Sequence, residues 1–134
     1  MSGPADLVSE ARKWRKMLGG GLRQVGIVAA AGVYAMEHHI DRLADDHATA
    51  TAFADALAAI DGVEVTAQAT NMVFLTAPGD PASLTTGMAD AGVSMLWSDV
   101  GGGRSASRVV THLDVDTSAV AVVTEALRRQ IEPD

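Results

Sequence analysis

The sequence contains no cysteine, which excludes disulfide bonds and thiolate metal sites. Aromatic residues are scarce as well, at 4%, although apolar residues make up 48% of the 134 positions. A core formed by this chain therefore has to be built mainly from small side chains such as Ala and Val, with close approach of the backbone. The lack of thiols is typical of proteins kept in a reducing compartment, so we expect a cytoplasmic protein.

Net positive charge and a membrane-length apolar run are also missing. The net charge is −7, whereas a nucleic-acid-binding domain usually carries a basic patch, so no nucleic-acid partner is expected. The longest apolar run, Val25–Met36, is shorter than the roughly 20 residues that span a bilayer, so no membrane partner is expected. No apolar signal-peptide segment follows Ser2–Ala5.

Basic residues do gather near the N-terminus. Half of the basic side chains lie there: Arg12, Lys13, Arg15, Lys16 and Arg23. The simplest interpretation of such a cluster is the solvated face of a helix.

Hydrophobic spacing predicts three helices in the first 60 residues, over 6–18, 22–36 and 40–60. The glycine run 19–21 ends the first helix, because glycine is costly inside a helix. The second helix is apolar nearly all round, so we expect it to be buried. The third is amphipathic. The residues expected on its apolar side are Ile40, Leu43, His47, Phe53, Leu57 and Ile60.

After Gly62 the pattern predicts strands over 63–67, 72–76, 93–97 and 108–113, helices over 82–91 and 117–131, and a loop or tight hairpin over 98–107. This order predicts an α/β fold of the α+β type, a small and mainly antiparallel sheet with helices on one face. The first two helices do not belong naturally to that layer. We therefore expect two parts, 1–36 and 37–134, the first of which closes a larger domain.

Gly19–Gly21 precede the second predicted helix, where free N–H groups at a helix N-terminus suit a phosphate. Arg23 would lie in the first turn, a position that disfavours a cation unless an anion compensates it. A plain turn between two helices is the alternative interpretation.

Arg108 is placed at the start of an apolar strand, Val109–Leu113. Its planar guanidinium matches both oxygens of a carboxylate, so the residue is a candidate carboxylate clamp. The alternative is a surface arginine at the end of a strand.

The histidines do not predict a metal site. No HxxxH pair is present, and His38 and His39 project about 100° apart on a helix, which prevents a shared tetrahedral site. Neither a Walker A sequence nor a G-x-S-x-G sequence occurs.

Three blocks of the sequence make a family recognisable. Ala11–His47 reads ARKWRKMLGGGLRQVGIVAAAGVYAMEHHIDRLADDH, Thr70–Phe74 reads TNMVF, and Arg108–Val115 reads RVVTHLDV. In content, order and spacing these blocks resemble the low-specificity L-threonine aldolases, which are pyridoxal-phosphate enzymes with the aspartate-aminotransferase type of fold. The resemblance covers essentially the whole chain.

The resemblance implies a reaction and a partial site. The family cleaves L-threonine or L-allo-threonine to glycine and acetaldehyde, with pyridoxal 5'-phosphate as the cofactor. By match of position, Arg108 would bind the carboxylate of the small amino-acid substrate. Arg23 would lie near the cofactor phosphate, in a homo-oligomer whose subunits can share the site. Lys16 would lie close to the cofactor without being the Schiff-base lysine.

The match also implies what these 134 residues lack. In the family the Schiff-base lysine lies upstream of the matched blocks, so no catalytic residue is expected in this chain. The chain then resembles the C-terminal part of an aldolase, inactive until the N-terminal cofactor domain is supplied. Two alternatives remain open: a non-catalytic module that assembles with full-length aldolase subunits or a separate N-terminal half, and a free-standing phosphate or carboxylate binder that uses Arg23 and Arg108.

Overall fold

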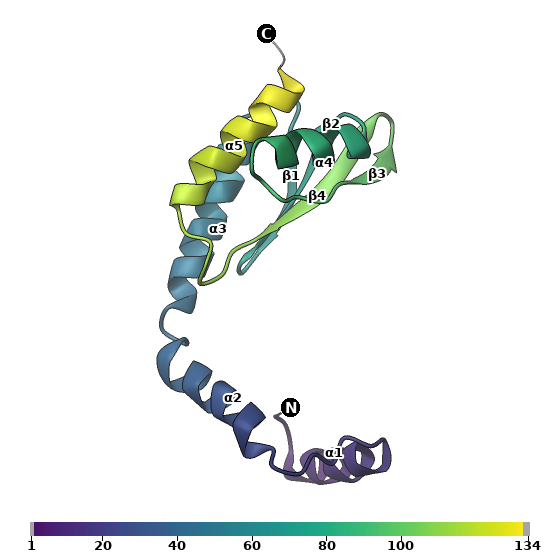
Figure 1. The fold of residues 1–134 in the computed structure, drawn as a ribbon, viewed down its shortest axis with the longest axis vertical. Coiled ribbons are helices and arrows are strands. Elements are labelled where there is room, and N and C mark those ends of the chain that lie inside the picture. Colours follow the sequence, from purple (N-terminus) through teal and green to yellow (C-terminus); the bar gives the residue numbers. More distant parts are fainter. Residues whose placement is uncertain (1, 133–134) are drawn as a thin grey trace. The chain divides into compact units, whose positions relative to one another are not determined.

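The computed structural model describes residues 2–132 and divides the chain into two compact units, which meet between Ile40 and Asp41. The first unit contains two helices, α1 (Ala5–Met17) and α2 (Gly26–His38). The elements of the second unit, in chain order, are α3 (Leu43–Ala58), β1 (Glu64–Ala69), β2 (Met72–Pro78), α4 (Pro81–Asp90), β3 (Ser98–Gly101), β4 (Arg104–Val110) and α5 (Ser118–Ile131) (Figure 1).

In the first unit, neither helix has a buried residue. Ile27 on α2 is 84% exposed and Val28 is 67% exposed, so neither is covered within the first unit. Burial of this helix against a larger domain stays a prediction. None of the helices in that range is long and apolar enough to cross a bilayer.

The start of α2 also differs from the prediction. The helix begins at Gly26 rather than at residue 22, and the residues before it form a turn. Gln24 has a φ of +46°, which lies outside the right-handed helical region and prevents the helix from beginning earlier.

The second unit is built on a four-stranded antiparallel sheet in the order β1-β2-β4-β3, which confirms the predicted class of fold. Val73, Leu75 and Ala77 alternate along β2 and are buried, as expected for a strand with one covered face. They form one core with apolar residues of α3, α4 and α5. The alternate positions of β2, including Phe74, belong to the opposite face, which these helices leave open.

The predicted packed face of α3 is confirmed at its C-terminal part, where Phe53, Leu57 and, just after the helix, Ile60 are buried, but not at its start. Leu43 and His47 are exposed, whereas Asp46 and Thr49 are buried. Two contacts of Asp46 explain this. Its carboxylate accepts a 2.6 Å hydrogen bond from Arg42, and its backbone carbonyl accepts a 2.7 Å hydrogen bond from the Thr111 hydroxyl.

The hairpin expected within 98–107 is present, and Gly101–Gly103 form its turn. Their φ values are +84°, +64° and +72°, a left-handed region that side chains disfavour. The predicted strand over 93–97 is wrong, because pairing with β4 begins only at Ser98, opposite Ala106. The last strand is also longer toward its N-terminus than predicted, since Arg104 pairs with Pro78 of β2.

Helix α4 begins at Pro81, one residue before the predicted start at 82, and the Asp80-Pro81 pair is typical of a helix start. The Asp80 carboxylate accepts a 2.9 Å hydrogen bond from the backbone N–H of Ser83, and Pro81 occupies the first turn. The hydrogen bonds from the Ser83 backbone and hydroxyl favour the ionised carboxylate, so the pKa of Asp80 is lowered from its ordinary value of 3.8.

Candidate functional site

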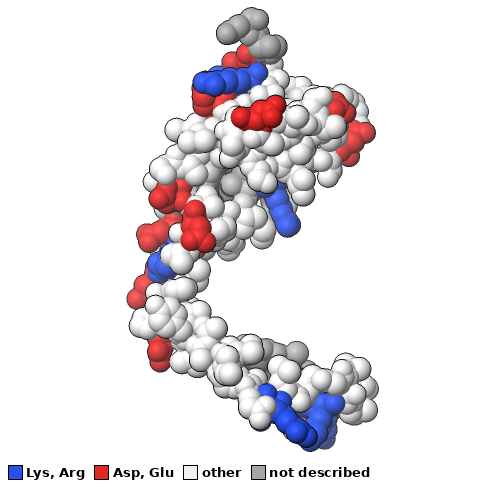
Figure 2. Space-filling model, in the orientation of Figure 1, with Lys and Arg blue, Asp and Glu red and all other residues white. Residues whose placement is uncertain are grey.

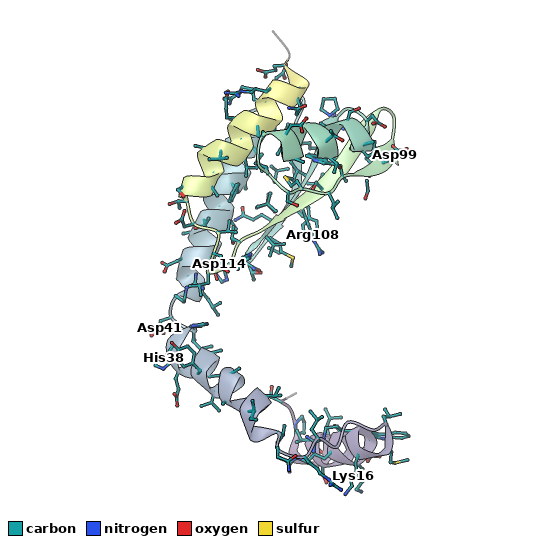
Figure 3. The ribbon with its side chains drawn as sticks, viewed as in Figure 1. Lys16, His38, Asp41, Asp99, Arg108 and Asp114 are labelled. Atoms are coloured by element: carbon teal, nitrogen blue, oxygen red, sulfur yellow. The ribbon has the colours of Figure 1, made fainter. Side chains whose placement is uncertain are left out.

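Arg108 lies within β4 rather than at its start, which corrects the sequence-based placement. It is the fifth residue of the strand and pairs with Phe74 of β2. Its side chain is exposed on the open face of the sheet (Figure 3). The strand begins earlier than the apolar run suggests because its first residues pair with the end of β2, at Ala77 and Pro78.

The guanidinium of Arg108 makes no hydrogen bond or ion pair with any residue in the range 2–132. Arg104, on the same strand, behaves differently. It donates a 2.8 Å hydrogen bond to the Thr76 hydroxyl and a 3.1 Å hydrogen bond to the Gly62 carbonyl. Arg104 therefore has a structural role, whereas Arg108 keeps its donors free for a ligand with a carboxylate.

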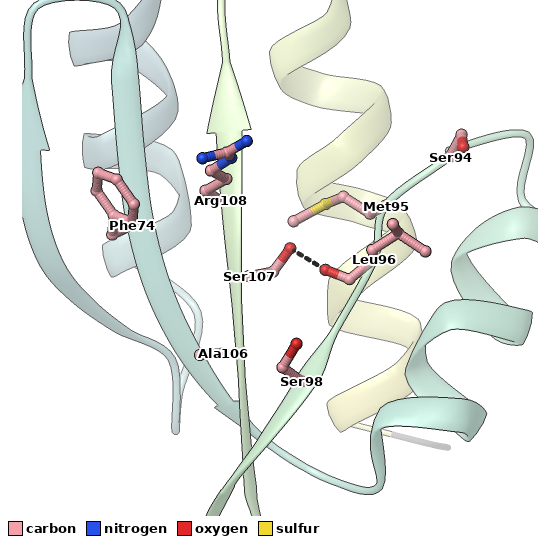
Figure 4. A pocket seen from close by; sticks show the side chains of 8 residues that line it. All are labelled: Phe74, Ser94, Met95, Leu96, Ser98, Ala106, Ser107 and Arg108. Carbon is pink, nitrogen blue, oxygen red and sulfur yellow. Dashed lines mark hydrogen bonds between the residues drawn. The ribbon is translucent and has the colours of Figure 1, made fainter.

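A hollow of about 540 Å³ lies beside Arg108. Phe74 and Leu96 contribute apolar walls, and Ser98 and Ser107 contribute hydroxyl groups (Figure 4). Arg108 is the only charged residue among those that line it. The hollow thus offers one positive charge in mixed apolar and hydroxyl surroundings, which suits a small monocarboxylate with an uncharged substituent.

The C-terminal end of β4 is fixed by a buried hydrogen-bond network that sequence reasoning missed. Thr111 is fully buried, and its hydroxyl donates to the Asp46 carbonyl of α3. The Asn71 side chain donates a 2.7 Å hydrogen bond to the Thr111 carbonyl, and the Thr111 N–H donates a 2.9 Å hydrogen bond to the Asn71 carbonyl. The network joins α3, the turn before β2 and the strand that carries Arg108. Asn71 lies in the block Thr70–Phe74 and Thr111 in the block Arg108–Val115. Their presence in the blocks that resemble the family was the only indication of these residues in the sequence.

Lys16 and Arg23 belong to the first unit, and both are exposed. Lys16 lies in the last turn of α1, where a cation also stabilises the helix through the macrodipole. Figure 2 shows Lys and Arg gathered on this helix. Arg23 lies in the turn before α2 and not in its first helical turn, so the argument from an unfavourable helix position does not hold.

The glycine run serves as a turn between helices. The N–H of Gly20 donates to the Arg15 carbonyl at 2.8 Å, and the N–H of Gly19 donates to the Lys16 carbonyl at 3.2 Å. These N–H groups satisfy the C-terminal carbonyls of α1 and are not free for an anion. Of the two interpretations of Gly19–Gly21, the structure favours the plain turn between helices, because α2 begins five residues after Gly21.

The histidines lie at positions with local partners. His38 stacks on Tyr34 with ring centroids 4.3 Å apart, and His112 lies 3.8 Å from the Asp114 carboxylate. Within residues 2–132, no group of three His, Asp or Glu side chains is placed to hold a metal ion.

The fold is a small α/β unit that exposes an arginine, Arg108, without a partner in the described residues on the open face of its sheet. The family described as Beta-eliminating lyase matches residues 1–78, which is more than half of the chain. The chain belongs to this family.

Curated relatives agree with this assignment. The chain is similar to the low specificity L-threonine aldolase of Escherichia coli (strain K12), with 39% identity over 122 residues, 90% of this chain and 34% of the relative. The low-specificity L-threonine aldolase 1 of Arabidopsis thaliana is 31% identical over 125 residues, 88% of this chain and 34% of the relative. The probable low-specificity L-threonine aldolase of Schizosaccharomyces pombe is 29% identical over 130 residues, 97% of this chain and 32% of the relative. The chain spans about a third of the length of these relatives.

The family implies pyridoxal phosphate, and the residues of this chain fit part of its surroundings. Arg108 offers free donors for the carboxylate of an amino acid, and Arg23 is an exposed cation for a phosphate. The only lysines, Lys13 and Lys16, both lie on α1, and the sheet unit contains none. Each unit of the described chain therefore has an exposed cation with the charge to meet an anionic group, Arg23 in the first and Arg108 in the second.

Proposed function

We propose that this chain is the C-terminal part of a pyridoxal-phosphate-dependent L-threonine aldolase, which cleaves L-threonine or L-allo-threonine to glycine and acetaldehyde. The observation that carries the proposal is the free, exposed guanidinium of Arg108, beside a hollow without other charges. The similarity to three named threonine aldolases over nearly the whole chain supports it.

In this proposal the residues of the chain bind and orient the reactants, and none performs a covalent step. Arg108 holds the substrate carboxylate through paired N–H···O bonds and so fixes the direction of the bond to be cleaved. Arg23 and Lys16 place positive charge near the cofactor phosphate. Bound pyridoxal phosphate supplies the electron sink for the developing carbanion.

The exposed apolar surface of α2 supports the proposal that residues 1–36 close a larger domain, while 37–134 form the small domain. Ile27, Val28 and Met36 are each more than 60% exposed, a condition that single folded proteins rarely tolerate over a contiguous patch. The relatives have about three times the length of this chain, which leaves ample sequence to cover the helix. The intact enzyme would be a cytoplasmic homo-oligomer.

The first experiment tests whether the 134-residue chain is catalytically complete. Purified chain is titrated with pyridoxal phosphate, treated with borohydride and analysed by visible spectroscopy, and glycine release from L-threonine is measured. We expect no stoichiometric reduced adduct and no glycine. Variants Lys13→Ala and Lys16→Ala are the controls. A stoichiometric adduct lost in one variant, together with glycine release, would overturn the claim that no lysine of this chain holds the cofactor.

The second experiment tests Arg108 directly. The Nε–H resonances of the ¹⁵N-labelled chain are followed while acetate is added, with neutral acetamide as the matched ligand control. We expect the Arg108 signal to shift saturably with acetate, in the millimolar range typical of one exposed charge pair. The Arg104 signal should move less, because the Nη2 group of that guanidinium is already bonded to Thr76 and Gly62. Disappearance of the shifting resonance in Arg108→Gln assigns that resonance to Arg108. No saturable Arg108 shift in the unsubstituted chain would refute the carboxylate-binding role.

A second function is favoured by the same exposed helix. The chain could act as a non-catalytic module that assembles with full-length aldolase subunits or with a separate N-terminal half. Its contact surfaces would then be the apolar surface of α2 and the basic residues of α1, which are Arg12, Lys13, Arg15 and Lys16. Two results together would favour the module over the catalytic part of an aldolase. The chain would co-purify with a full-length aldolase, and a mixture of the chain with a separate cofactor domain would release no glycine from L-threonine.

A further inference from the structure

One edge of the Arg108 hollow is formed by a segment that resembles a strand in burial but not in hydrogen bonding. Val93, Met95 and Trp97 are buried, while Ser94 and Leu96 between them are exposed, Leu96 by 83%. This alternation is typical of an extended chain with one face on the core. The core therefore holds the segment from one side only.

The same segment lacks the ladder that would join it to β4. Pairing between β3 and β4 ends at Ser98 and Ala106, and within residues 2–132 no backbone hydrogen bond joins Ser94, Met95 or Leu96 to β4. Beyond this last pair the Ser94–Leu96 segment separates from β4, and residues of both line the hollow next to Arg108. Because the ladder stops there, no backbone pair joins the Ser94–Leu96 segment to β4 beside Arg108.

A single side chain bridges the gap. The hydroxyl of Ser107 donates a 2.6 Å hydrogen bond to the carbonyl of Leu96 (Figure 4). Ser107 immediately precedes Arg108 in β4, so this hydrogen bond attaches the segment to the strand one residue before Arg108. Ser98 provides a useful contrast, because it lines the same hollow and its hydroxyl has no hydrogen-bond partner in the described residues.

We propose that Ser107 is a positioning residue, which holds the Ser94–Leu96 segment as the second wall of the carboxylate site formed by Arg108. This inference rests on the proposed function, since it assumes that Arg108 receives a carboxylate. The hydrogen bond from Ser107 to Leu96 fixes the distance between the segment and β4 without the backbone ladder that would close the hollow. Leu96, whose side chain is exposed there, then limits the space left for the substituent of the bound carboxylate.

The test uses the full chain and two independent measurements on Ser107→Ala, Ser107→Thr and Ser98→Ala. The first is the ¹³C′ shift of Leu96 with the ¹⁵N relaxation of Ser94–Leu96, which report the hydrogen bond and the segment's mobility without any ligand. The second is the dissociation constant for acetate from the Arg108 Nε–H shift. Ser98→Ala is the matched control, because it makes the same chemical change in the same hollow.

We expect Ser107→Ala to change the Leu96 shift, to mobilise the segment and to weaken acetate binding about three- to tenfold, the range of one neutral hydrogen bond. Ser107→Thr should restore binding, and Ser98→Ala should leave the Leu96 ¹³C′ shift and the relaxation of Ser94–Leu96 unchanged, because the Ser98 hydroxyl makes no hydrogen bond in the described residues. Unaltered relaxation and binding in Ser107→Ala would overturn the positioning role, even if the unsubstituted chain binds acetate. An altered Leu96 signal together with no acetate binding by the unsubstituted chain would instead refute the proposed function, and the positioning role with it.

Discussion

Replacement of Thr111 by Val should destabilise the sheet unit by a predictable amount. Valine keeps the branched shape of threonine, so the change removes mainly the hydroxyl, which is fully buried and has no access to water. That hydroxyl donates to the Asp46 carbonyl at 2.7 Å and, at the longer distance of 3.3 Å, to the Asn71 carbonyl. The Asn71 carbonyl keeps the Thr111 N–H as a donor, so it is not left unsatisfied. One good and one weak hydrogen bond are worth about 1–2 kcal/mol of unfolding free energy.

For a unit that spans Asp41–Asp134, this loss corresponds to a melting temperature lower by roughly 4–16 °C. The measurement is thermal unfolding followed by circular dichroism, with urea unfolding as a second probe. Thr66→Val is the matched control, because Thr66 is exposed on β1 and its hydroxyl has no hydrogen-bond partner in the described residues. A Thr111→Val melting temperature within about 2 °C of the unsubstituted chain would refute the reasoning that this hydroxyl fastens α3 to the end of β4.

Two further predictions concern charge and apolar surface. Asp80→Ala should destabilise α4, and the effect should depend on pH in a defined direction. Because the folded pKa of Asp80 is lowered, its ionised form contributes fully above the ordinary value of 3.8, and this contribution is lost as pH falls through the folded pKa. The difference in urea midpoint between Asp80→Ala and the unsubstituted chain should therefore shrink from about pH 7 to about pH 3, and a constant difference would contradict the capping role. Ile27→Glu should reduce self-association of the chain, because Ile27 is the most exposed large apolar residue of α2. Light scattering measures this, and an unsubstituted chain that is already monodisperse and monomeric would contradict it.

Local rules predicted the parts of the fold that depend on neighbours in sequence. Asp80 and Pro81 start α4 because a cap needs only the backbone three residues onward. The strand predicted over 72–76 and the loop or tight hairpin predicted over 98–107 are equally local, and the structure contains both a strand and a hairpin there. The predicted class of fold follows from the order of these elements.

Contacts between distant residues account for the errors. Helical periodicity predicts the burial of Phe53 and Leu57 in α3 but not that of Asp46, whose carbonyl accepts a hydrogen bond from Thr111, 65 positions away. The strand expected over 93–97 has the right alternation, yet its partner is a serine hydroxyl instead of a backbone ladder. For α2, a single left-handed residue, Gln24, moves the start of the helix past Arg23.

The sequence predicted which residue is the candidate for carboxylate binding, but not whether its guanidinium has hydrogen-bond partners. The chemistry of arginine and the resemblance to the aldolases both indicate Arg108 from sequence. What sequence could not distinguish is Arg108 from Arg104 on the same strand. The two differ because Arg104 reaches Gly62 and Thr76, which lie 42 and 28 positions away, whereas Arg108 reaches no partner in residues 2–132.

The turn between β3 and β4 has a consequence for the handedness of the chain. Gly101, Gly102 and Gly103 all adopt φ values that are the mirror image of ordinary ones, so three successive positions favour the opposite chirality. Among the residues of ribosomal synthesis, glycine meets that demand at the lowest conformational cost, whereas L-residues adopt a positive φ only rarely, as Gln24 does in this chain. In a chemically synthesised chain, a D-amino acid has its preferred backbone region at these positions. Mirror-image residues in this hairpin would therefore stiffen the turn by narrowing the unfolded ensemble.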